Sequence, residues 1–110
     1  MSDPLGPVFS ALSDPTRRRV VERLSEGVPL TATALAAELP ISRQAVSKHL
    51  SALSEAGLVE AERVGRELRY ALTVHPMHDV VTWMAEIGAE WDERLGSLRE
   101  HLAGRRHTGR

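Results

Sequence analysis

The sequence predicts a mainly α-helical fold with one small β-hairpin, in the order α-α-α-α-β-β-α. Apolar residues recur at helical spacing in successive segments before residue 57 and again after residue 76. Between residues 59 and 72 apolar and polar residues alternate instead, which is typical of half-buried strands. The chain has 110 residues, which is enough for one domain with its own core and short for an enzyme with a deep cleft.

Three helices are expected before residue 41. A short helical segment covers residues 5–12, and Asp14-Pro15 begins the second helix, because Asp caps and Pro fits the first helical position. Thr31 caps the third helix, which Pro40 closes. The three arginines at 17–19 cannot share one helix face. Solvent-exposed or acid-paired positions are favoured for them over contacts with phosphate.

The central stretch, ISRQAVSKHLSALSEAGLV (41–59), predicts a fourth helix with two different faces. Ser42 is a good N-cap, and Gly57 stands where a helix commonly ends in the left-handed region. Val46, Leu50 and Leu53 form one apolar stripe. The opposite face suits the DNA major groove, where Arg pairs with guanine and Gln with adenine, although an ordinary solvated face is the alternative. It carries Arg43, Gln44, Ser47, Lys48 and Ser51.

A basic hairpin is expected directly after this helix. Gly65-Arg66 forms a two-residue loop with Gly first, which suits a type II′ turn. Arg63, Arg66 and Arg69 lie near its tip. Because only Pro40-Ile41 separates the third helix from the cap of the fourth, the segment reads as a helix-turn-helix followed by a wing.

A long helix is expected from Pro76 to about Ala103. Its apolar positions are spaced close to a heptad seam that is longer than a small core needs. We therefore expect half of the seam to pack on a second copy, with coverage of its own domain as the alternative. The last residues lack apolar side chains, so the prediction is a domain over 1–104 and a disordered tail over 105–110. The expected dimer interface is Val80, Met84, Ile87, Trp91, Leu95 and Leu98.

Composition excludes several classes of protein. The net charge is −1, but residues 41–70 hold five Lys or Arg against four Glu, whereas residues 76–103 hold two Arg against six acids. There is no cysteine, hence no disulfide or thiolate ligand, and no secretory signal or membrane span is recognisable. A cytoplasmic location is expected. No catalytic Ser/His/Asp spacing or glycine-rich phosphate loop suggests an enzyme.

The phrases ALSDPTRRRVVERL (11–24), ISRQAVSKHLSALSEAGLV (41–59) and VGRELRYALT (64–73) resemble the ArsR/SmtB family of winged helix-turn-helix repressors. The resemblance implies a dimer that blocks transcription on double-stranded DNA until an inducer releases it. By position, the residues in or beside the major groove would be Arg43, Gln44, Ser47, Lys48 and His49, together with the cap Ser42. Arg63, Arg66 and Arg69 would reach the minor groove or the backbone. His49 falls near the buried edge of its helix, which favours packing or a phosphate contact.

Many members of that family bind metals through cysteines or through Asp, His and Glu ligands in the last helix. Here the cysteines are absent, and His75, His78 and Asp79 lack the matching spacing. No metal or cofactor is therefore expected, and any small-molecule inducer is unknown. Two functions stay open at this point. The first is a dimeric repressor on an inverted-repeat operator, and the second is a winged-helix protein-interaction module that no longer binds DNA. The basic residues favour the first.

Overall fold

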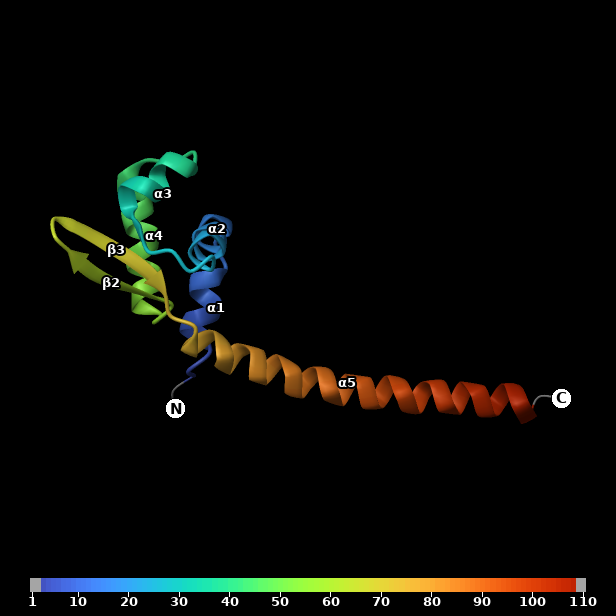
Figure 1. Ribbon diagram of the computed structural model, residues 1–110. Helices are drawn as coiled ribbons and strands as arrows, with labels where there is room; N and C mark the ends of the chain where they lie inside the picture. The colour runs from blue at the N-terminus through green and yellow to red at the C-terminus, as the bar shows by residue number, and fades with distance from the viewer. Residues whose placement is uncertain (1–2, 109–110) are drawn as a thin grey trace. The chain divides into compact units, whose positions relative to one another are not determined.

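The computed structural model describes residues 3–108, with side chains up to residue 104, and it divides into two compact units, Met1–Asp79 and Val80–Arg110. All the predicted helices and both predicted strands are present (Figure 1). In chain order the elements are α1 (Gly6–Leu12), α2 (Pro15–Leu24), β1 (Leu30–Thr31), α3 (Ala32–Glu38), α4 (Arg43–Glu55), β2 (Val59–Val64), β3 (Glu67–Leu72) and α5 (His75–Thr108).

Side-chain caps begin three of the helices, as the sequence predicts. Oδ1 of Asp14 accepts the backbone N–H groups of Thr16 at 2.8 Å and Arg17 at 3.1 Å. The hydroxyls of Thr31 and Ser42 each accept the N–H of the residue three positions further on, at 3.1 Å. Each cap satisfies donors that the first turn of a helix leaves without partners, which fixes where α2, α3 and α4 begin.

The three adjacent arginines of α2 have separate surroundings. Nη1 of Arg18 donates to the carbonyl oxygens of Leu12 at 2.7 Å and Ser13 at 3.1 Å. Arg18 therefore satisfies acceptors at the C-terminal end of α1. Arg17 is half-buried, and Arg19 is exposed.

The first unit contains a three-stranded antiparallel sheet with strand order β1-β3-β2. The hairpin of β2 and β3 closes at Gly65, which has φ of +64°, while no described non-glycine residue has a positive φ. Because the first loop residue has a positive φ and the second does not, the turn agrees with the predicted type II′ and not with type I′, which needs a positive φ at both positions. The sequence did not predict β1, because two residues are too few to show an alternating pattern and its strand character comes from pairing with β3.

Helix α4 is the centre of the first unit: it contacts α1, α2, α3 and β2. Its predicted stripe, Val46, Leu50 and Leu53, is completely buried. In α3 the buried residues are Ala32 and Leu35, whereas Ala36 and the C-cap residue Leu39 are only half-buried. Burial of the α4 stripe holds its other face outward, and this orientation positions the candidate site.

Helix α5 continues to Thr108, so its predicted end near Ala103 is wrong. The sequence beyond Ala103 contains no proline, and glycine lowers helix propensity without stopping a helix. Residues 105–108 of the predicted tail are thus helical, and residues 109–110 lie outside the described residues. None of the helices within residues 3–108 combines the length and apolar character that a membrane span requires.

Candidate nucleic-acid interface

The exposed face of α4 carries the polar side chains that the sequence predicts there. Arg43, Gln44, Ser47 and Lys48 are all exposed, opposite the buried stripe. Ser42 is exposed as well, but its hydroxyl accepts the N–H of Ala45 as the helix cap. The structure therefore presents a row of four hydrogen-bonding or charged side chains at the N-terminal half of α4.

His49 does not belong to this exposed row. Its side chain is half-buried, and its charge is one of the influences that lower the pKa of the Asp14 carboxyl. The largest cause of that lowered pKa is the hydrogen bond from the backbone N–H of Arg17. The half-buried state of His49 agrees with its predicted position at the buried edge of the helix.

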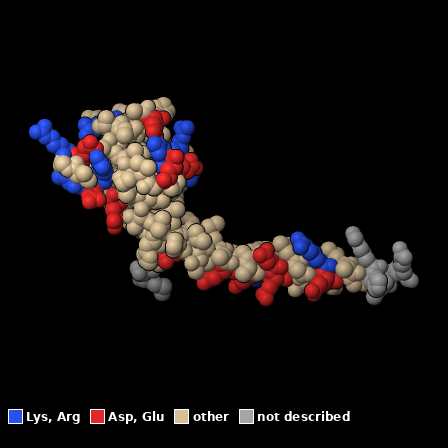
Figure 2. Space-filling model, in the orientation of Figure 1, with Lys and Arg blue, Asp and Glu red and all other residues tan. Residues whose placement is uncertain are grey.

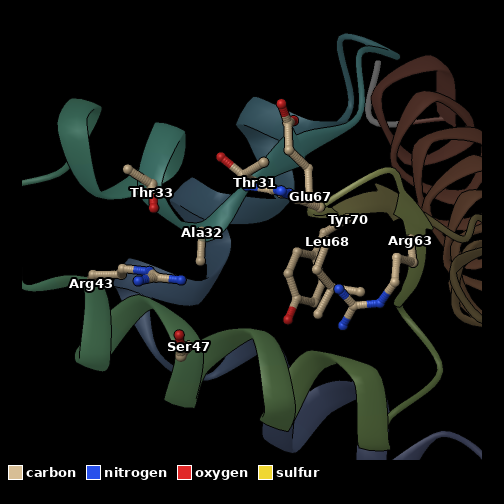
Figure 3. A pocket seen from close by; sticks show the side chains of 10 residues that line it. Thr31, Ala32, Thr33, Arg43, Ser47, Arg63, Glu67, Leu68 and Tyr70 are labelled. Carbon is tan, nitrogen blue, oxygen red and sulfur yellow. The ribbon is translucent and has the colours of Figure 1, made fainter.

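A cleft of about 530 Å³ lies between α4, the start of α3 and the hairpin (Figure 3). Three arginines line it, one from α4 and two from the hairpin: Arg43, Arg63 and Arg66. In Figure 3 the guanidinium groups of Arg43 and Arg63 extend into the same space, which the hydroxyl of Tyr70 also faces. The remaining lining residues are Thr31, Ala32, Thr33, Ser47, Glu67 and Leu68.

The two faces of the hairpin separate its arginines. Arg63 pairs with Leu68 in the strand register, and residue alternation places Tyr70 on that same face. Arg69 pairs with Glu62 on the opposite face, and its Nε donates to Oε2 of Glu67 at 3.1 Å. The structure thus brings Arg63 and Arg66 to the cleft with Arg43, whereas Arg69 does not line that cleft.

Sequence reasoning missed Thr33 and Tyr70 as members of this site. Tyr70 reads as an inward apolar position of its strand, and Thr33 as an ordinary residue of a short helix. Both reach the cleft because β3 lies beside the start of α3 through the pairing of β1 with β3. Only the strand alternation, which puts Tyr70 on the face of Arg63, carried any signal of this arrangement.

Basic side chains gather at the tip of the hairpin, at the left of the view in Figure 2. Acidic side chains are prominent along α5 in the same view, in agreement with the charge division of the sequence. Among residues with described side chains, no three of His, Asp or Glu lie close enough together to hold a metal ion.

The helix pair α3–α4 followed directly by the hairpin defines the winged helix-turn-helix class. A model of a helix-turn-helix domain matches residues 12–62. The chain is 36% identical over 88 residues to the transcriptional repressor SdpR of Bacillus subtilis, covering 80% of this chain and 97% of that protein.

The fold is shared with solved structures of transcriptional regulators. An ArsR-like transcriptional regulator from Rhodococcus sp. RHA1 is 43% identical with a TM-score of 0.74, over 88% of this chain and 91% of that one. The homodimeric winged helix-turn-helix DNA-binding domain of Mb0332 from Mycobacterium bovis is 28% identical with a TM-score of 0.62, over 83% and 81%. The chain belongs to the ArsR family of winged helix-turn-helix transcriptional regulators, and it is a regulator rather than an enzyme.

Proposed function

We propose that the protein is a homodimeric, sequence-specific DNA-binding repressor that recognises an inverted-repeat operator. The observation that carries this proposal is the meeting of the exposed polar face of α4 with Arg63 and Arg66 of the hairpin around one cleft. A solvated helix face alone would not require basic residues from a second element at the same place. Electropositive surfaces shared by a recognition helix and a wing are typical of duplex DNA binding.

In the proposed complex, α4 enters the major groove. Its exposed side chains include Gln44, whose amide can donate to and accept from adenine in that groove. The tip of the hairpin reaches the neighbouring minor groove or the backbone with Arg66. Ser42, Lys48 and His49 contribute at the edges of this surface. Of these, Ser42 caps its own helix and His49 is half-buried, so we expect weaker effects from them than from Gln44.

The proposed dimer forms through α5. Met84, Trp91, Leu95 and Leu98 are exposed large apolar side chains, and Val80 and Ile87 on the same stripe are half-buried. Trp91 is 55% exposed, with the guanidinium carbon of Arg94 at 5.3 Å from its ring centroid. A contiguous exposed apolar stripe of this kind marks an interaction surface, and the Mb0332 domain is homodimeric.

Repression is favoured because SdpR is a transcriptional repressor and matches across nearly its whole length. A dimer bound over a promoter blocks transcription by excluding RNA polymerase. This role requires the protein to be in the cytoplasm, where the chromosome lies.

The sequence contains no cysteine, so we do not expect the protein to sense metals through thiolate ligands. We expect zinc, nickel and cobalt at low micromolar concentration to leave the DNA complex intact in a gel shift. Release by one of them, reversed by His78→Ala, would contradict this.

Selection of bound duplexes from a random pool tests the proposed function. We expect an imperfect inverted repeat with half-site centres about 34 Å, or one helical turn, apart. Recovery of sequences without any common element would favour a winged-helix module that contacts proteins instead of DNA.

A further inference from the structure

We infer that the cleft between α4 and the hairpin holds one backbone phosphate of the DNA duplex, and that Arg43 contacts this phosphate rather than a base. The inference rests on the proposed DNA binding and goes further by assigning the contacts. It adds Tyr70 to the interface and removes Arg43 from the residues that read sequence.

The position of the cleft identifies its occupant. One side of the cleft is the exposed face of α4, through Arg43 and Ser47, and the other is the hairpin, through Arg63 and Arg66. In a DNA duplex a sugar-phosphate strand separates each major groove from the next minor groove. Because α4 occupies the major groove and the hairpin tip reaches the adjacent minor groove, that strand has to cross the space between them. The cleft lies at this crossing.

The chemistry of the cleft agrees with a phosphate diester. Guanidinium groups from two different elements, on Arg43 and Arg63, extend into the space, and the forked donors of Arg match phosphate oxygens (Figure 3). The hydroxyl of Tyr70 faces the same space, and Ser47 and Thr33 line it with two further hydroxyl donors. These groups recognise oxygen acceptors that carry negative charge, which is what the backbone presents at every sequence.

Glu67, the one acid among the described residues that line the cleft, does not oppose this assignment. In Figure 3 the side chain of Glu67 points away from the space that Arg43 and Arg63 share. Its Oε2 accepts from Nε of Arg69 at 3.1 Å, so the carboxylate has a counterion on the outer face of the hairpin. The cleft therefore keeps the guanidinium groups of Arg43 and Arg63 for its ligand. Base reading falls to Gln44, which is exposed on α4 and does not line the cleft.

The test is a set of duplexes of the selected sequence, each with a neutral methylphosphonate at one position in each half-site. Fluorescence anisotropy gives the dissociation constant of each duplex for the full chain and for its Arg43→Ala, Arg63→Ala, Tyr70→Phe and Arg69→Ala variants. On the unmodified duplex we expect Arg63→Ala and Arg43→Ala each to weaken binding about tenfold, and Tyr70→Phe about threefold. When the contacted phosphate is replaced by a methylphosphonate, each of these three substitutions should weaken binding less than about twofold, because the charge that they contact is already gone. This reduction should occur for all three at the same phosphate position, or at two adjacent ones. Arg69→Ala, the matched control on the other face of the hairpin, should keep its effect at every position.

Two results would overturn the inference. The first is that the losses caused by Arg43→Ala and Arg63→Ala persist on every neutralised duplex. The second is that Arg43→Ala changes which base is preferred, since a backbone contact carries no sequence information. A failure of the proposed function itself would be recognised earlier. In that case the wild-type protein would select no common DNA sequence, and no modified duplex could be designed.

Discussion

Arg69 and Glu67 are paired on the outer face of the hairpin, with Nε of Arg69 donating to Oε2 of Glu67 at 3.1 Å. Directly before Glu67 the chain turns at Gly65 and Arg66, and Arg66 lines the cleft that the hairpin shares with α4. Neighbouring arginines of one hairpin therefore have different surroundings. Arg69 has a counterion within the protein, and Arg66 faces the proposed DNA surface.

This difference predicts unequal effects of two similar substitutions. Arg66→Ala should weaken binding to all duplexes alike and reduce the slope of log K against log salt by about 0.9, because one phosphate contact is lost. Arg69→Ala should change the slope much less, since its charge is already compensated. The measurement is anisotropy at several salt concentrations. Equal slopes for the two variants would contradict the proposal that Arg66 contacts a phosphate and Arg69 does not.

Gln44 should control base preference. Its side chain is exposed on α4 beside Arg43 but outside the cleft, which leaves its amide available to a base. We expect Gln44→Ala to cost about 1–3 kcal/mol on the preferred duplex and almost nothing on a non-specific one. Competition binding with duplexes substituted at single positions measures this. A Gln44→Ala protein with unchanged affinity and unchanged base preference would place the recognition surface elsewhere.

Trp91 should be central to the dimer. Its indole is 55% exposed, although it lies on the apolar stripe of α5. If a partner copy covers it, Trp91→Ala removes a large buried area and should weaken the dimer by roughly 3 kcal/mol or more. Sedimentation should then detect monomers, and DNA binding should weaken with them. Glu93→Ala, an exposed position on the side of α5 opposite the stripe, serves as the control and should leave the dimer intact.

The Asp14 cap gives α2 a pH dependence of known sign. Hydrogen bonds from the N–H groups of Arg17 and Thr16 hold the pKa of the Asp14 carboxyl below its ordinary value of 3.8. A group whose folded pKa is lowered stabilises the protein above its unfolded pKa, and this contribution is lost as the pH falls through the folded value. The melting temperature of the wild type should therefore fall as the pH drops below about 3.8, where this contribution is lost. Asp14→Asn keeps the acceptor but should lack that part of the pH dependence. Identical pH profiles would contradict the role assigned to the carboxylate charge.

The features of the fold that depend on local chemistry could be predicted from the sequence. Asp14, Thr31 and Ser42 begin helices through hydrogen bonds to residues two or three positions away, and Gly65 sets its turn by its own φ. Features that depend on distant contacts could not. Strand β1 exists because of its pairing with β3, a contact between segments about forty residues apart.

The candidate site shows the same division. The exposed face of α4 follows from its apolar stripe, so Gln44 could be predicted with its neighbours. The membership of Tyr70 in the cleft depends on how β3 lies beside α3 and could not. That Arg69 and Arg63 lie on opposite faces of the hairpin could be predicted from the sequence. Two residues that are six positions apart, on either side of a two-residue turn, fall on opposite faces.

The central claim is that two linked copies of α4 read two half-sites on one side of the duplex. The most direct measurement is the affinity for the selected operator after about five base pairs, half a helical turn, are inserted between its half-sites. The half-turn insertion rotates one half-site to the far side of the duplex and should weaken binding roughly 100-fold. An insertion of about ten base pairs should weaken binding less, because it returns both half-sites to the same side of the duplex. If the half-turn insertion leaves the affinity unchanged, the protein does not bind DNA as a two-fold dimer.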